Sequence, residues 1–159
     1  SLIADFRSEL NPGGLLASLE DLATQFRARN SIMLEFQNRL VDLALPIEHE
    51  IQVFNIVREA LANAVRHSHA RHVRIELRQT QDGEASVSVE DDGIGLSPAC
   101  EEHNHFGLAI IRERAASIGA RLSIEAIRPH GVRVHLGLRR HHDLPQGSLD
   151  GLHDLITDR

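Results

Sequence analysis

The hydrophobic and polar positions between Asn55 and Ser68 repeat with the period of a helix. Four polar side chains recur at i, i+4, i+7 and i+8 and share one face of it: Glu59, Asn63, Arg66 and His67. Most other positions are apolar, which predicts a largely buried helix over Ile47 to Ser68. We interpret the polar stripe as the lining of a cavity that holds a metal ion and phosphate groups. The alternative is a helix whose few polar groups face water.

Apolar and polar residues alternate in five further segments, which predicts five strands with one buried face each: 32–36, 72–80, 84–90, 121–127 and 132–138. The turn Gln81-Asp82-Gly83 makes the second and third an antiparallel hairpin. Two more helices are expected, one capped by Asn11 and running from Pro12 to about Arg29, the other from Phe106 to Gly119. We predict an α+β fold, a two-layer sandwich whose mixed, mostly antiparallel sheet is covered by helices on one face.

The length and composition of the chain indicate its domain organisation and exclude several classes of function. The 159 residues fit one domain, expected at 11–138, after the end of an upstream helix or linker at 1–10 and before a tail at 139–159. The net charge of -6 argues against a nucleic-acid partner. All 17 basic residues are arginine, so the chain has no lysine. This excludes a Walker A phosphate loop, a Schiff-base mechanism and a kinase that uses a lysine on a strand. With no long apolar run or signal peptide, we expect a cytoplasmic domain.

The motif Asp91-x-Gly93-x-Gly95 directly follows a predicted strand. Glycines let the backbone approach a flat ligand, and a carboxylate at the strand end accepts hydrogen bonds from an exocyclic amine. The alternative is an ordinary Asp-Gly turn. A dinucleotide site is excluded because Pro98 replaces the third glycine of that motif.

Phe106-Gly107-Leu108 is predicted to open a helix, whose free N–H groups and dipole attract phosphate. A simple loop-to-helix junction is the alternative. The order of a polar-striped helix, an Asp-x-Gly-x-Gly turn and a glycine-opened helix favours one shared site. The histidines and acids next to Cys100 lack the spacing of a zinc site, and we expect Ser97 to Phe106 to form a mobile lid.

Three segments resemble motifs of the ATP-binding domain of sensor histidine kinases, the Bergerat or GHKL fold shared with gyrase, Hsp90 and MutL ATPases. Residues 58–68 resemble its N box, residues 91–96 its first glycine box, and residues 107–115 its second. The second box has the form typical of kinases whose response regulators carry a helix-turn-helix output domain. Residues 104–107 are similar to those of nitrate/nitrite sensor kinases.

The resemblance implies ATP and Mg²⁺ as cofactors and a phosphoacceptor histidine on a separate dimerisation domain, absent from this sequence. Asn63 would give an oxygen to Mg²⁺, and Glu59 would act as the catalytic residue that polarises or deprotonates the acceptor or a metal-bound water. Arg66 and His67 would face the phosphates, and Asp91 would bind the adenine amino group. The other nucleotide-binding residues would be Gly93, Gly95, Leu96, Phe106, Gly107 and Leu108.

For the full-length protein the resemblance implies a homodimer in the bacterial inner membrane that acts on such a response regulator. An anti-sigma-factor-type serine kinase or a nucleotide-sensing module on the same fold is the alternative. Two positions depart from the family pattern: His105 stands where many relatives have glycine, and Val132 where a threonine hydroxyl helps to hold adenine. An unpaired polar group costs about 1–3 kcal/mol, so we expect weakened nucleotide affinity.

Overall fold

The computed structural model describes residues 10–40, 43–66, 69–95 and 98–139, with the backbone alone for 98–106. In this part of the chain the elements are, in order, α2 (Leu15–Arg29), β1 (Met33–Arg39), α3 (Ile47–Arg66), β2 (His72–Gln79), β3 (Ala85–Asp91), α4 (Pro98–Ser117), β4 (Arg121–Ala126) and β5 (Val132–Leu138). The predicted segment 1–10 and the tail lie almost wholly outside these ranges.

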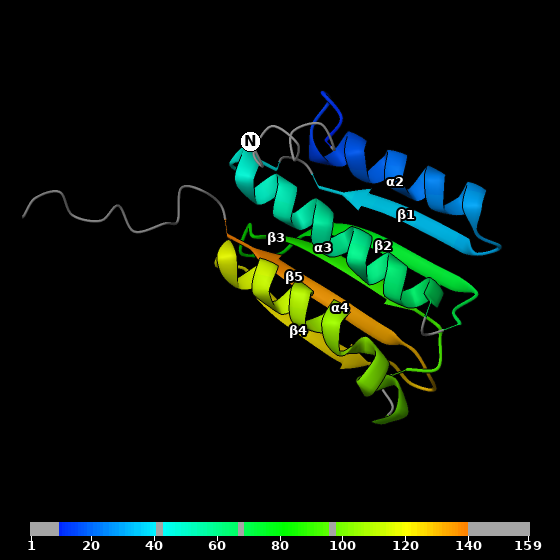
Figure 1. Cartoon of the computed structure of the whole chain (residues 1–159). Coiled ribbons are helices and arrows are strands. Elements are labelled where there is room, and N and C mark those ends of the chain that lie inside the picture. Colours follow the sequence, from blue (N-terminus) through cyan, green and yellow to red (C-terminus); the bar gives the residue numbers. More distant parts are fainter. Residues whose placement is uncertain (1–9, 41–42, 67–68, 96–97, 140–159) are drawn as a thin grey trace, which may run out of the picture.

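The five strands form one sheet in the order β1-β2-β3-β5-β4. The β1–β2 pair is parallel and the other three pairs are antiparallel, so the sheet is mixed. Figure 1 shows α2, α3 and α4 side by side on the same face of the sheet. The predicted two-layer α+β sandwich is confirmed. None of the helices in the described ranges has the length and apolarity that crossing a membrane requires.

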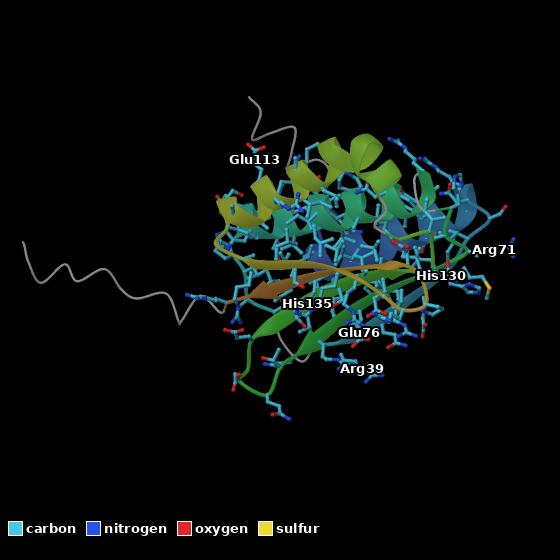
Figure 2. The ribbon with its side chains drawn as sticks, turned by 90° about the horizontal axis from the view of Figure 1, so that it is seen from below. Arg39, Arg71, Glu76, Glu113, His130 and His135 are labelled. Carbon is cyan, nitrogen blue, oxygen red and sulfur yellow. The ribbon has the colours of Figure 1, made fainter. Side chains whose placement is uncertain are left out.

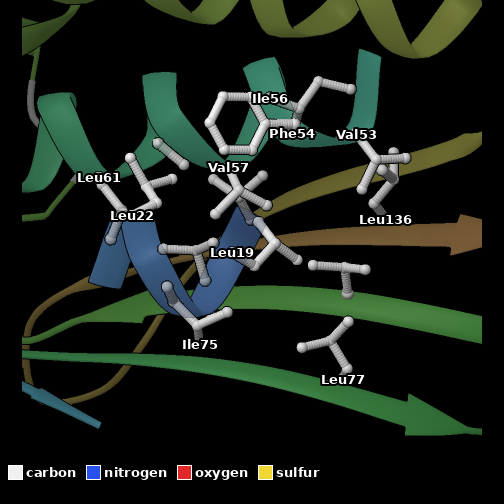
Figure 3. Packing of buried hydrophobic residues seen from close by; sticks show 14 of the residues in the cluster. Leu19, Leu22, Val53, Phe54, Ile56, Val57, Leu61, Ile75, Leu77 and Leu136 are labelled. Carbon is white, nitrogen blue, oxygen red and sulfur yellow. The ribbon is translucent and has the colours of Figure 1, made fainter. Parts of the chain in front are cut away.

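The core lies between the helices and the sheet. Alternate residues of β2 point into it, and Ile75 and Leu77 are fully buried. On α3 the apolar positions around the polar stripe supply the opposing surface, with Ile56, Val57 and Leu61 at most 2% exposed. Figure 3 shows Val57 and Leu61 on the side of α3 toward the strands, and Ile75 and Leu77 on the strands below them. Alternation along the strands and the helical period of α3 therefore build the core that the sequence predicts.

The other face of the sheet is polar, and in the described ranges no helix packs on it. The strand registers place five side chains of alternating charge in one row across it: Glu35, Arg74, Glu90, Arg133 and Glu125. Arg74 Nε lies 3.2 Å from Glu35 Oε2, and Arg133 Nε lies 2.6 Å from Glu90 Oε1. Figure 2 shows Glu76 and His135 on this open side. Cross-strand pairs of opposite charge stabilise a solvated face of a sheet.

The first described helix begins later than predicted. Asn11 does not cap a helix at Pro12, because its Oδ1 accepts the N–H of Gly13 and its carbonyl accepts the N–H of Gly14. Gly14, at φ 92°, then precedes Leu15 as the N-cap without a side-chain bond. Asn11 thus closes a turn through two glycines rather than starting the helix.

The start of α4 also differs from the prediction. The helix begins at Pro98 instead of Phe106, so the backbone of the predicted lid is helical from Pro98 on, and Gly107 lies in the helix interior. Proline suits the first helical position, and the following Glu101 and Glu102 favour a helix N-terminus. The prediction that a helix N-terminus at Gly107 attracts phosphate is therefore wrong. The predicted stop is confirmed, since Gly119 has φ 63° and donates its N–H to Ala116.

Candidate functional site

The polar stripe of α3 meets α4 at Gly107. A Cβ atom on Gly107 would lie 2.7 Å from Asn63 Oδ1 and 3.1 Å from Glu59 Oε1. Both side chains are only partly buried. Glycine costs up to about 1 kcal/mol in a helix interior, and here it lets two polar side chains approach the α4 backbone. The structure therefore brings together Glu59, Asn63 and Gly107, which lie apart in the sequence.

The two ends of the stripe differ in burial. Arg66 is the last residue of α3 and is exposed, and His67 lies outside the described residues. At the other end, Asn55 extends the stripe by one turn and is 2% exposed. Its Oδ1 accepts a hydrogen bond from Arg58 Nη2 at 2.6 Å, whereas its Nδ2 has no hydrogen-bond partner in the described structure. Our sequence interpretation missed Asn55, although it lies four residues before Glu59 on the same face.

Asp91 is the last residue of β3 and begins the glycine turn. Its Oδ1 accepts the N–H of Gly93 at 2.8 Å. Gly93 and Gly95 are buried, and Gly95 has φ 84°, which favours glycine. The motif thus forms a compact turn that holds the carboxylate by its own backbone. The predicted residue Leu96 lies outside the described structure.

The turn between β4 and β5 closes onto this segment. Gly131 has φ 123°, and a Cβ atom there would lie 2.0 Å from the carbonyl oxygen of Asp91. Val132, which pairs with Asp91 in the sheet register, is 8% exposed. A buried apolar side chain thus stands at the position where the resemblance implies a threonine hydroxyl. The Asp91 turn is therefore enclosed by backbone on its β5 side.

Burial raises the pKa of the Asp91 carboxyl. The backbone N–H groups of Gly93 and Val132 act in the opposite direction, and the neighbouring charge of Asp92 adds to the increase. A carboxylate has about four lone-pair sites, so these bonds leave acceptor capacity for a ligand amine. Asp91 is thus a partly desolvated carboxylate at the end of a strand, and its role as the acceptor for a ligand amine stays a prediction.

Asp92 is held on the other side of the turn. Its Oδ1 accepts the N–H groups of Arg71 at 2.8 Å and His72 at 2.9 Å, and its Oδ2 lies 2.8 Å from His72 Nδ1. Burial raises the pKa of Asp92, but the hydrogen bonds from His72 and Arg71 outweigh it and lower the pKa to about 2. Asp92 therefore fixes the turn to the start of β2 and is not predicted from the sequence.

The structure describes the side chain of only one of the two remaining predicted residues of α4. Leu108 is partly buried and packs against the core. Phe106 is described by its backbone alone, within α4.

A cavity of about 930 Å³ adjoins Asp91, but strands β1 and β2 line most of it and neither Glu59 nor Asn63 contributes. The described structure thus holds the predicted site residues in two places, the α3–α4 contact at Gly107 and the Asp91 turn.

Comparisons with known proteins show the family of the chain. Residues 48–142 match the family model described as "Histidine kinase-, DNA gyrase B-, and HSP90-like ATPase". The nitrate/nitrite sensor protein NarQ of Escherichia coli is 30% identical over 138 residues, 87% of this chain. The nitrate/nitrite sensor protein NarX of Escherichia coli is 32% identical over 74% of this chain. The chain spans 24% and 19% of these two relatives.

Solved structures show the same fold. The histidine kinase domain of the blue-light activated kinase EL346 from Erythrobacter litoralis matches with a TM-score of 0.65 and 26% identity, covering 79% of this chain and 64% of that one. The ATP-binding domain of PrrB from Mycobacterium tuberculosis matches with a TM-score of 0.56 over 74% of this chain and 88% of that one. At 23% identity the second shows the fold alone. The chain therefore belongs to the histidine kinase-, DNA gyrase B- and HSP90-like ATPase family, as the ATP-binding catalytic domain of a sensor histidine kinase.

Proposed function

We propose that this domain binds ATP with Mg²⁺ between the Asp91 turn and the α3–α4 contact, and positions the γ-phosphoryl group for transfer to a histidine on a separate dimerisation domain. The observation that carries the proposal is the convergence of Glu59 and Asn63 on Gly107, where a Cβ atom would lie 2.7 Å from the amide oxygen. Such transfer depends mainly on positioning and charge neutralisation, which fixed polar groups supply.

The donor set fits magnesium. Mg²⁺ prefers oxygen ligands and is usually held by one or two protein groups together with substrate phosphates and water. The amide oxygen of Asn63 would be a ligand, and the Glu59 carboxylate would polarise or deprotonate the acceptor or a metal-bound water. Arg66 and His67 would face the phosphates, for which guanidinium is well suited. The metal would neutralise charge on the phosphates during transfer.

At the opposite end of the nucleotide, Asp91 would accept a hydrogen bond from the adenine amino group. Gly93, Gly95, Leu96, Phe106, Gly107 and Leu108 would bound the pocket. This assignment rests on the buried carboxylate and on the match of residues 48–142 to the ATPase family.

In the full-length protein we propose a homodimer, anchored in the bacterial inner membrane, that phosphorylates a response regulator with a helix-turn-helix output domain. The support is the 30% identity to a nitrate/nitrite sensor protein. The match to the histidine kinase domain of EL346, at 26% identity, favours a histidine kinase over a serine kinase on this fold. The net charge of -6 supports a protein partner over a nucleic acid.

Substituting Asn63 tests the metal site. We expect Asn63→Ala to remove most of the gain in ATP affinity that Mg²⁺ gives the wild type, a loss of about tenfold in the presence of the metal, because one charge-assisted contact contributes about 1.5–3 kcal/mol. Calorimetric titration of ATP with Mg²⁺ and with excess chelator measures this gain. Gln81→Ala, in the exposed β2–β3 turn, is the control and should keep it. A full magnesium gain in Asn63→Ala would remove Asn63 from the metal site.

A further inference from the structure

His130 connects the β4–β5 turn to the glycine turn after β3. Its Nδ1 lies 2.7 Å from the carbonyl oxygen of Asp92 and 3.2 Å from that of Gly93. A carbonyl oxygen only accepts hydrogen bonds, so Nδ1 must carry the hydrogen and donate to both. Figure 2 shows His130 at the same end of the molecule as Arg71, which precedes β2. One imidazole thus joins segments 37 and 38 residues apart.

The peptide group between Asp92 and Gly93 links His130 to Asp91. Its N–H donates to Asp91 Oδ1 at 2.8 Å, and its carbonyl oxygen accepts from His130 at 2.7 Å. The peptide is planar, so rotating it would move both groups and break both bonds. Hydrogen bonds in such a chain also polarise one another. The orientation of the Asp91 carboxylate therefore depends in part on the His130 ring, which acts on it through this peptide.

Neighbouring contacts hold the Asp92 side chain next to this peptide. The Asp92 carboxylate is bound by the N–H groups of Arg71 and His72 at 2.8 Å and 2.9 Å. The Asp92 side chain is thus held from β2, while its carbonyl is held from the β4–β5 turn. Losing the imidazole would free the carbonyl side of the peptide and leave the Asp91 carboxylate to the N–H groups of Gly93 and Val132, the first of which would no longer be fixed from the β4–β5 turn.

We propose that His130 is a positioning residue that sets the selectivity of the site for a base with an exocyclic amino group. It orients Asp91 through the Asp92–Gly93 peptide, so that the carboxylate meets the amine without rearrangement. This inference rests on the proposed contact between Asp91 and adenine. It assigns to a histidine of the β4–β5 turn a role in choosing the base.

Two ligands and three variants test it. The ligands are Mg-ATP and the purine ribonucleoside triphosphate that lacks the 6-amino group, each titrated by calorimetry. His130→Ala removes the donor, and His130→Asn keeps an N–H donor at the same number of bonds from Cα. His135→Ala is the matched control, because His135 lies on the open face of the sheet and bonds to Ser88 at 2.8 Å.

We expect the wild type to prefer ATP by about tenfold or more, as a site built to bind an amine rejects the analogue that lacks it. His130→Ala should reduce the preference to about threefold or less by weakening ATP alone, since fewer ordered contacts support the acceptor. His130→Asn should restore it, and His135→Ala should leave it unchanged. Thermal melting checks that each variant is folded.

The outcomes separate the inference from the proposed function. A wild type without preference for ATP would overturn the adenine contact itself. If the wild type prefers ATP and the folded His130→Ala variant prefers it equally, only the role of His130 is overturned. Equal weakening of both ligands by His130→Ala would show a purely structural histidine and would also overturn it.

Discussion

Asp91→Asn is expected to weaken Mg-ATP binding by about 10- to 100-fold, because a hydrogen bond to a charged group contributes about 1.5–3 kcal/mol. The carboxylate is partly desolvated and already oriented by the Gly93 N–H at 2.8 Å. Asparagine keeps the shape but replaces one acceptor by a donor, which would face the adenine amino group. Calorimetric titration measures the change in dissociation constant.

The same carboxylate predicts how binding depends on pH. Only the ionised form accepts from the amine on both oxygens, and burial raises the pKa of Asp91 above its usual value of 3.8. Wild-type affinity should thus be full above the raised pKa and fall as the pH drops through it, at a higher pH than for an ordinary aspartate. Asp91→Asn should lack this fall, and Asp82→Asn, in the exposed β2–β3 turn, should bind like the wild type. Wild-type affinity in Asp91→Asn would refute the contact.

Gly131→Ala is expected to lower the free energy of unfolding by about 3–5 kcal/mol or to prevent folding. The alanine Cβ atom would lie 2.0 Å from the backbone oxygen of Asp91. Because this neighbour is backbone and not the end of a flexible side chain, it cannot move aside easily. The residue also has φ 123°, a conformation that side chains rarely adopt. Urea denaturation followed by circular dichroism measures the loss.

Gly119→Ala is the matched control for backbone conformation. Gly119 also has positive φ, at 63°, but a Cβ atom there would have no neighbour within 4 Å. We expect Gly119→Ala to lower the free energy of unfolding by only about 1–2 kcal/mol, because a side chain destabilises the left-handed conformation by this amount. A similar loss for both variants would mean that the Gly131 contact with Asp91 contributes nothing beyond its backbone angle.

Much of the fold follows from local patterns in the sequence. Alternation predicts the strands because each side of a strand faces one environment, and Ile75 and Leu77 are buried as their period requires. Helix starts were less predictable. Gly13 and Gly14 let the chain turn before α2, and the polar residues after Pro98 form helix rather than loop. In both cases a local signal was compatible with two conformations.

The candidate site, too, was predictable only where it depends on local sequence. Glu59 and Asn63 could be placed together because one helix carries both at i and i+4. Their contact with Gly107 depends on how α3 and α4 pack, and the bond from His130 to Asp92 joins residues 38 positions apart. No local pattern marks such contacts, since they arise only when the sheet brings the β4–β5 turn against the end of β3.

The central claim is that the Asp91 turn and the α3–α4 contact enclose one nucleotide. The most direct measurement is a titration of the isotopically labelled protein with Mg-ATP, following the backbone amide resonances of Gly93 and Gly107. The account predicts that both resonances shift with the same dissociation constant, because the base and the phosphates of one molecule reach them. If either resonance stays unchanged at saturation, or the two report different constants, the two clusters do not form one site.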